Sequence, residues 1–164
     1  MLREISAGGV VVRPATTGWE VAVIEPRGEP TPGESDKKRQ KKEVLALPKG
    51  LIDPGEKPAE TAVREVREET GILAKVLTKL TDIKYVYVRS WGDRQRVFKI
   101  VTFYLLQYES GTIDEISPDM RIEVKQSRWI PIEDAQKKLA YRGERSVIQL
   151  AREKLKSLQE EAQA

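Results

Sequence analysis

The sequence predicts an α/β protein, and three observations lead to this fold class. Its 164 residues are a usual length for one domain, and 39% hydrophobic with 34% charged residues is typical of globular proteins. Two segments, within residues 58–70 and 144–158, carry apolar residues at helical spacing. Other segments show the alternation or the short apolar runs of β-strands. We therefore expect residues 1–164 to form a single domain in which helices pack on a sheet.

Two strands are expected at the beginning of the chain. Ile5–Arg13 contains an apolar run, and Trp19–Glu25 alternates apolar and polar residues after a turn at Gly18. Within the first strand, Gly8 and Gly9 indicate a close approach of another backbone segment or a bulge.

Residues 28–43 differ in composition from their surroundings, and we expect them to form a loop insertion. They contain Pro, Gly and a basic run of Lys37, Lys38, Arg39, Lys41 and Lys42. This loop either reaches over a site and attracts polyphosphate or is simply solvated, as runs of like charge usually are. After it, Val44–Leu47 is expected to form a short strand leading into Pro48, Lys49 and Gly50.

A helix is expected between Pro58, which suits a first helical position, and Gly71, which suits the residue just past a helix end. Its apolar stripe should lie on the core and consists of Ala59, Ala62, Val63 and Val66. Beside it lies a stripe of carboxylates, Glu65, Glu68 and Glu69.

These glutamates indicate a cation site rather than a solvated face. Glu65 and Glu69 are like charges four residues apart, which costs about 0.2–0.5 kcal/mol, and they lie where the helix macrodipole disfavours anions. Clustered carboxylates supply only oxygen ligands, which suits Mg²⁺ or Mn²⁺. Because the chain has no His and no Cys, catalysis must use carboxylates, lysines, tyrosines, hydroxyls or metal-bound water.

Two strands are expected after this helix. Ala74–Arg89 is predicted to be extended, with Tyr85 and Tyr87 on one face, where they would stack a nucleobase or form cross-strand pairs. Val97–Leu106 is the most apolar run and is expected to be a buried strand.

A lysine interrupts the buried strand. Lys99 needs an anionic partner there, either a protein carboxylate or a substrate phosphate, unless it protects a sheet edge. The nearby Arg96 favours phosphate.

The last part of the chain is predicted to contain a loop, a strand and two helices. Gly111–Arg121 is a polar loop, and a strand follows from Glu123 to Ile130. Pro131–Leu139 should start a short helix, and Glu144–Leu158 an amphipathic one with Val147, Ile148, Ala151, Leu155 and Leu158 inward.

One pattern resembles a known family. The chain matches the Nudix box, G-x5-E-x7-R-E-U-x-E-E-x-G-U with U a large aliphatic residue, at Gly50, Glu56, Arg64, Glu65, Val66, Glu68, Glu69, Gly71 and Ile72. Outside the box the resemblance rests on the order of the elements. It implies an α/β/α sandwich with a mixed sheet between helices. It also implies hydrolysis, dependent on Mg²⁺ or Mn²⁺, of a nucleoside diphosphate linked to another moiety.

The resemblance also implies roles for residues of the box. Glu65 and Glu69 would bind metal, and Glu68 would bind metal or act as a base. Glu56 would pair with Arg64 and tie the loop to the helix.

Further ligands are implied outside the helix. The backbone carbonyl of Gly50 would add one ligand. An extra carboxylate would come from the later loop, with Glu123 and Glu115 as candidates for a metal ligand or base.

The residue before the box points to a branch of the family. Lys49, in the segment LPKG, resembles enzymes that cleave dinucleoside polyphosphates or diphosphoinositol polyphosphates. Its ammonium would hold an extra phosphate, or it is an exposed loop lysine. Tyr141 and Arg142, between the last two helices, resemble the end of polyphosphate-hydrolysing members.

Three functions remain open. The first is a dinucleoside polyphosphate hydrolase, and the second a pyrophosphatase for ADP-ribose or another nucleoside diphosphate sugar. The third is a nucleotide or RNA sensor that binds without cleaving.

The composition adds expectations about partners and location. The formal charge of +3 suits a small nucleotide and makes nucleic acid an unlikely partner. No apolar run approaches the roughly 18 residues of a membrane span, and no signal-peptide pattern is present, so the cytoplasm is expected. The sequence leaves the oligomeric state open between a monomer and a homodimer.

Overall fold

The computed structural model describes residues 1–28, 43–89 and 92–163. The elements are β1 Leu2–Pro14, β2 Trp19–Pro26, β3 Lys49–Leu51, α2 Pro58–Thr70, β4 Leu73–Val88, β5 Arg96–Ser110, η1 Met120–Ile122, β6 Val124–Pro131, α3 Ile132–Lys138 and α4 Arg142–Gln163. The expected basic run at residues 37–42 lies outside the described residues.

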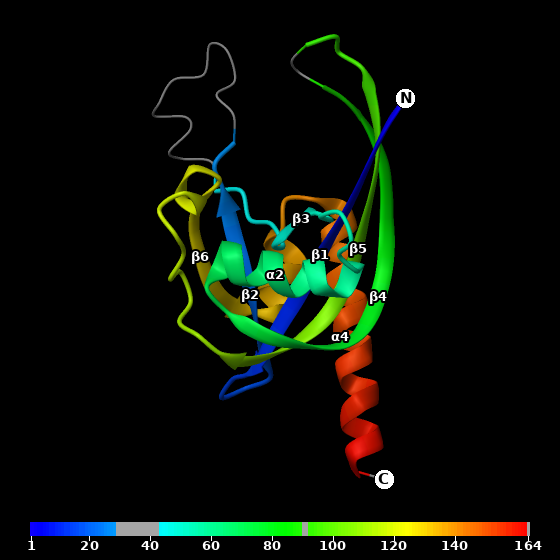
Figure 1. The fold of residues 1–164 in the computed structure, drawn as a ribbon. Helices are drawn as coiled ribbons and strands as arrows, with labels where there is room; N and C mark the ends of the chain where they lie inside the picture. Colours follow the sequence, from blue (N-terminus) through cyan, green and yellow to red (C-terminus); the bar gives the residue numbers. More distant parts are fainter. Residues whose placement is uncertain (29–42, 90–91, 164) are drawn as a thin grey trace.

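The strands form one mixed sheet with the order β4-β5-β1-β2-β6, and β3 pairs with β1 beside that path. β1 runs parallel to β5, whereas the other pairs are antiparallel. Helix α2 crosses one face of the sheet, and α3 and α4 lie on the other (Figure 1). The expected α/β/α sandwich, with a mixed sheet between helices, is therefore confirmed.

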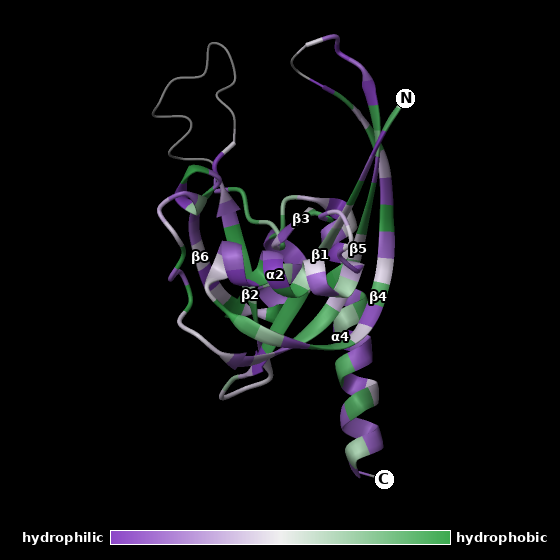
Figure 2. Cartoon of the chain, viewed as in Figure 1, coloured by the Kyte–Doolittle hydropathy of each residue, from purple (hydrophilic) through white to green (hydrophobic). Residues whose placement is uncertain are grey.

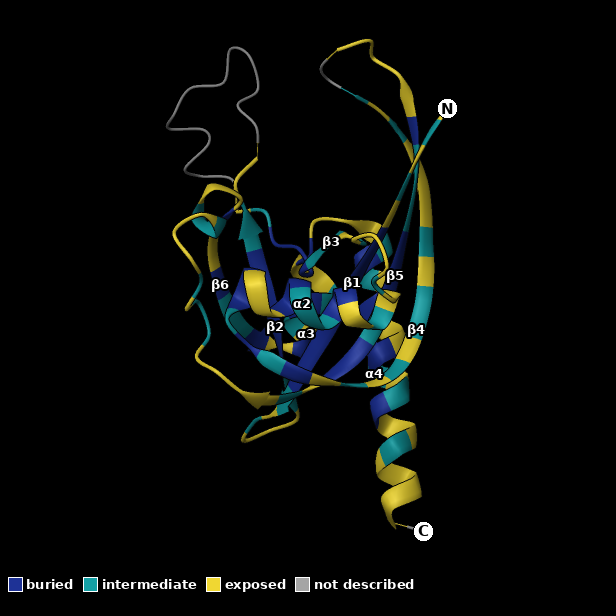
Figure 3. Ribbon diagram, in the orientation of Figure 1, coloured by how far each residue is buried: buried dark blue, intermediate teal, exposed yellow. Residues whose placement is uncertain are grey.

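The alternation of side chains along β1 explains why both faces are apolar. Val10 and Val12 belong to the large core between the sheet and α4, whereas Val11 belongs to the smaller core under α2. A strand covered on both faces needs apolar residues at successive positions, which explains the run in the sequence. The inner strands are accordingly hydrophobic and buried, while the last turns of α4 extend beyond the sheet and are exposed (Figures 2 and 3).

Helix α2 begins and ends where the sequence predicts. Pro58 occupies the start, and the Glu60 carboxylate accepts a hydrogen bond from the Lys57 N–H at 3.1 Å, which satisfies a donor at the helix start. Gly71 ends the helix in a left-handed conformation with φ 82°, and its N–H donates to the Arg67 carbonyl. The buried face includes Ala62 and Val66, each 0% exposed.

The first half of β1 pairs with β3 rather than with β2, and a glycine makes this approach possible. A Cβ on Gly8 would lie 2.5 Å from the Pro48 carbonyl oxygen, and the Gly9 N–H donates to the same oxygen. The prediction of a close backbone approach is therefore confirmed. The two halves of the sheet separate here, and the chain between residues 48 and 51 lies in the gap.

Several boundaries differ from the sequence prediction. The strand expected at Val44–Leu47 is wrong: single bridges occur there, and regular pairing begins at Lys49, where the glycines of β1 leave room. β4 ends at Val88, and Arg142 is the first residue of α4 rather than part of the connection. No helix within the described residues combines the length and apolar character that crossing a membrane requires.

Candidate functional site

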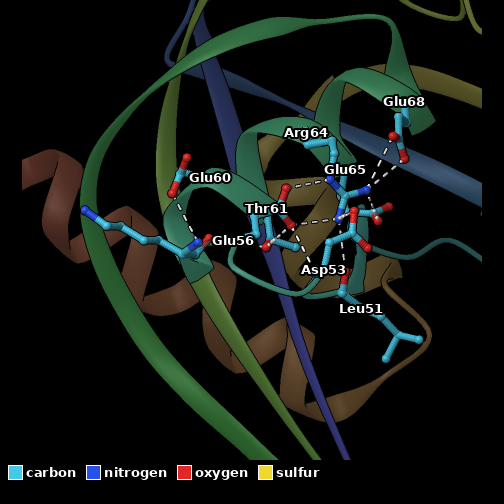
Figure 4. Close-up of polar contacts among 9 residues, drawn as sticks. Leu51, Asp53, Glu56, Glu60, Thr61, Arg64, Glu65 and Glu68 are labelled. Carbon is cyan, nitrogen blue, oxygen red and sulfur yellow. Dashed lines mark hydrogen bonds and ion pairs between the residues drawn. The ribbon is translucent and has the colours of Figure 1, made fainter.

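Arg64 is the centre of a polar network that ties the loop before α2 to the helix (Figure 4). Its Nε and Nη2 donate to the two carboxylate oxygens of Glu56 at 2.8 and 2.9 Å, and Nη2 also donates to the Leu51 carbonyl at 3.0 Å. Hydrogen bonds from Arg64 and Thr61 lower the pKa of Glu56 to about 2. The expected pair of Glu56 and Arg64 is therefore present, in the strong two-point geometry.

Two of the three glutamates in the predicted carboxylate stripe face the protein. Glu65 and Glu69 are only 9% and 6% exposed, and the Glu65 carboxylate lies against Gly50, where a Cβ would be 2.2 Å away. Burial raises the pKa of each, and the neighbouring carboxylates raise it further; Glu65 adds to the effect on Glu69. Without a counterion, these charges are therefore poorly compensated.

The three glutamates of the predicted stripe differ in exposure. Glu68 has a 42% exposed side chain and pairs with Arg64 at 3.2 Å. The physical reason is the helical turn of about 100° per residue, which puts Glu68 on the solvent side while Glu65 and Glu69, one turn apart, face the sheet. Within the described residues, no three acidic side chains form a ready-made metal site.

The residues present nevertheless fit a hard divalent cation. The donors at the Glu65–Glu69 pair are carboxylate oxygens, the ligands that such cations prefer. Arg64 reaches Glu65 at 2.9 Å, whereas Glu69 accepts a hydrogen bond from the backbone N–H of Lys49 at 3.1 Å. A cation at this pair would relieve the repulsion that raises both pKa values.

Glu69 of this pair lines a cavity of about 360 Å³, which we call the carboxylate cavity. Its walls include Glu69, Gly50 and Glu123. Of the two candidates for an extra carboxylate, Glu123 therefore lies at the site, and its charge also raises the pKa of Glu69. Glu115 does not line the cavity; its backbone packs against Gly71 at the end of α2.

A second cavity of about 690 Å³, which we call the tyrosine pocket, adjoins the first. Three tyrosines line it, Tyr85, Tyr87 and Tyr141, and the rings of Tyr85 and Tyr87 are 6.3 Å apart. The two cavities share Lys49, Lys99 and Tyr141. A ligand with a ring at one end and phosphates at the other could therefore occupy both.

Both lysines at this junction have carboxylate partners. The Lys49 ammonium lies 2.7 Å from Glu144 and its side chain is 21% exposed, so the interpretation as an exposed loop lysine is wrong. Lys99 lies 3.9 Å from Glu4, which is a protein partner of the kind the sequence required. Arg96 is exposed and lines neither cavity, because it lies at the end of β5 opposite Val88.

Sequence reasoning missed three residues of the site. Glu144 was expected only as the start of a helix, yet it is 3% exposed and also accepts a hydrogen bond from the Leu47 N–H at 2.7 Å. Glu4 and Ser6 were not considered. The sequence did contain a signal for Glu4 and Ser6. Both are polar, although they lie on the same face of the strand as the apolar Val10 and Val12.

This chain is similar to several known proteins. A family model described as NUDIX domain matches residues 5–151. The putative mutator protein MutT4 of Mycobacterium tuberculosis (strain CDC 1551 / Oshkosh) is 34% identical over 99% of this chain and 60% of that protein. The asymmetrical bis(5'-nucleosyl)-tetraphosphatase of Mus musculus is 35% identical over 54% of this chain and 56% of that protein. The chain thus spans less than two thirds of either relative.

The likeness to solved structures concerns the fold. The crystal structure of a C. elegans Ap4A hydrolase binary complex matches with a TM-score of 0.65 and 22% identity, over 94% of this chain and 98% of that one.

Proposed function

The chain belongs to the Nudix family, whose members use divalent metal ions and act on small nucleotides, and on that premise we propose that it hydrolyses a phosphoanhydride bond of a dinucleoside polyphosphate. One observation carries the proposal. Glu69, buried one helical turn from the buried Glu65, lines a cavity that continues, past Lys49 and Lys99, into a pocket lined by tyrosines.

The metal end of this site is built from α2 and β3. Glu65, Glu69 and the carbonyl of Gly50 would hold Mg²⁺ or Mn²⁺, with Glu68 or Glu123 as a further ligand. When bound, such an ion activates water and neutralises charge on phosphate oxygens. The chain itself orients these ligands: Arg64 fixes the Glu65 carboxylate, and the Lys49 N–H fixes that of Glu69.

The proton from the attacking water needs a carboxylate. Glu123 lines the carboxylate cavity, whereas Glu68 is paired with Arg64, so we assign Glu123 as the general base. Glu56 acts by holding Arg64 in place.

The substrate end supports a nucleoside with several phosphates. A nucleobase would stack on the rings of Tyr85, Tyr87 or Tyr141, and the ammonium groups of Lys49 and Lys99 would meet the phosphates that follow. The mouse relative, named for cleaving bis(5'-nucleosyl) tetraphosphates, supports the same substrate class. We further propose that residues 1–164 form one domain acting in the cytoplasm.

A substrate panel tests the proposal. The purified protein is incubated with diadenosine tetraphosphate, ADP-ribose and a diphosphoinositol polyphosphate, each with Mg²⁺, with Mn²⁺ or with excess chelator, and products are identified by mass. We expect fastest turnover of the tetraphosphate and none with chelator. Turnover unaffected by chelator would refute the metal site. Binding of every nucleotide without cleavage would instead identify a sensor.

A further inference from the structure

Ser6 has a buried hydroxyl without a partner. Its residue is 0% exposed, and among the described residues its Oγ is the one buried side-chain polar atom that makes no hydrogen bond. Such an atom costs free energy unless a ligand or water satisfies it, and in native proteins it therefore calls for an explanation. Ser6 lines the carboxylate cavity, so the hydroxyl borders a space that a ligand can enter.

The strand register places Ser6 between two lysines. Along β1, Glu4, Ser6 and Gly8 share one face, because side chains alternate in a strand. Lys99 of β5 is paired with Glu4, and Lys49 of β3 is paired with Gly8. A Cβ on Gly8 would be 2.7 Å from the Lys49 Cβ, which shows that the Lys49 side chain leaves β3 on this same face.

Both lysines retain free hydrogen-bonding capacity. An ammonium has three donors. Lys49 has one close carboxylate partner, Glu144, at 2.7 Å, and its contact with the Leu47 carbonyl is long at 3.5 Å. Lys99 has Glu4 at 3.9 Å, which is beyond hydrogen-bond distance. Burial lowers the pKa of Lys99, and the carboxylate of Glu4 opposes this effect. The charge of Lys49 lowers the pKa further, so the two cations are close enough to repel each other.

We propose that the Ser6 hydroxyl donates to an oxygen of the substrate phosphate that Lys49 and Lys99 meet, and we call these three residues the donor row. Three donors and two positive charges on one face select an anion with several acceptor oxygens. The donor row lies at the junction of the two cavities, so it holds a phosphate between the nucleoside and the phosphate at the carboxylates. This inference rests on the proposed function and narrows its substrate class to chains with at least one phosphate beyond the reacting pair.

Binding of inorganic tripolyphosphate in excess chelator tests the donor row without metal or turnover. Calorimetric titrations compare the native protein with Ser6→Ala, and thermal melts are recorded for both. We expect the native protein to bind and Ser6→Ala to bind about tenfold more weakly, since a hydrogen bond to a charged group is lost. The melting temperature of the variant should be unchanged or higher, because an unsatisfied hydroxyl has been removed.

Ser127→Ala is the matched control. Ser127 is also buried, at 2% exposure, but its Oγ contacts Asp114 Oδ1 at 3.3 Å. This variant should melt at a lower temperature and bind tripolyphosphate like the native protein. The pair of variants therefore separates loss of an internal contact from loss of a ligand contact.

Three outcomes would overturn the inference: no tripolyphosphate binding by the native protein, equal binding by Ser6→Ala, or a lower melting temperature of Ser6→Ala. The last would show that the hydroxyl is satisfied inside the protein, for example by a trapped water. Each leaves metal-dependent hydrolysis untouched, and a failure of hydrolysis in the substrate panel leaves tripolyphosphate binding untouched. Ser6→Ala should also raise the KM for diadenosine tetraphosphate by a larger factor than the KM for ADP-ribose.

Discussion

Single residues of the same type have different roles in this protein because their surroundings differ. Glu56 is held by Arg64 and Thr61 and has a pKa of about 2, whereas burial raises that of Glu69 well above its usual value. The positive charge of Arg64 fully compensates the charge of Glu56, in the loop, and only partly compensates the charges of the carboxylates on α2, such as Glu65. The charge that remains uncompensated is therefore located at the buried pair, where a metal ion can use it.

The Glu56–Arg64 pair makes a prediction for pH. The folded pKa of Glu56, about 2, lies below the ordinary value of 4.5, so its ionised form stabilises the fold. This contribution is complete above about pH 4.5 and is lost as the pH falls towards 2. Glu56→Gln should therefore be less stable than the native protein at pH 7, and the difference should vanish near pH 2.

Urea unfolding of both proteins between pH 7 and pH 2 measures this difference. Glu160→Gln, at an exposed position on α4, is the control and should match the native protein throughout. A difference that stays constant down to pH 2 would contradict the assignment.

At the scale of elements, the segment before β3 is attached to α4 by one carboxylate. Glu144 accepts from the Leu47 N–H and pairs with Lys49, 97 and 95 residues away in the sequence. The same segment is held against β1 by the Pro48 carbonyl. The donor row and the carboxylate cavity depend on both attachments, since each fixes where β3 lies.

Removing one partner of the Lys49–Glu144 pair should be costly. Glu144→Ala leaves the buried Leu47 N–H and the poorly solvated Lys49 ammonium without their partner. We expect a loss of about 2–3 kcal/mol in unfolding free energy, after allowing for the partial exposure of Lys49. Lys49→Met should also destabilise. The double variant should lose less than the sum of the two, because the second change removes the charge that the first left unpaired. Strict additivity in urea titrations would show that the pair does not couple.

A second prediction at the level of elements concerns the close approach of β3 to β1. Gly8→Ala places a methyl group 2.5 Å from the Pro48 carbonyl and should destabilise by about 1–3 kcal/mol, since the backbone must move. Gly28→Ala, where a Cβ meets nothing within 4 Å, is the control and should change stability by less than about 0.5 kcal/mol. Equal melting temperatures of the two variants would refute the tight contact.

In the whole molecule, the large hydrophobic core and the polar candidate site occupy different regions of the sandwich. The large core lies between the sheet and α4, and the polar site lies where β1 leaves β2 to pair with β3. Charge is concentrated in that gap, and within the part of the chain that the structure describes the charge of Lys49 offsets that of Glu69 only in part. A ligand ion should therefore affect the stability of the entire fold.

Divalent metal should stabilise the native protein. Its melting temperature should rise with Mg²⁺ as RT ln(1 + [Mg²⁺]/Kd). Glu69→Gln should melt slightly higher than the native protein without metal, by a few tenths of a kcal/mol, because repulsion with Glu65 is relieved. It should show a smaller Mg²⁺ shift and almost no turnover. A fully active variant with an undiminished shift would remove Glu69 from the metal site.

Features that depend on local spacing could be predicted from the amino-acid sequence. The ends of α2 follow from Pro58 and Gly71, and the pairing of Glu56 with Arg64 was implied by the box to which both belong. The apolar run within Ile5–Arg13 similarly predicted a strand, which the structure contains as part of β1. Local patterns are reliable here because dihedral preferences and helical periodicity act within a few residues.

Only the tertiary structure decided which distant residues meet. The partner of Lys49 is Glu144, 95 positions away, and the hydroxyl of Ser6 lies between two lysines of other strands. The same holds for Glu68, which turned to solvent while its neighbours were buried. Such contacts depend on strand register and on which helix face meets the sheet, and a shift of one residue in register would send every side chain of a strand to the opposite face.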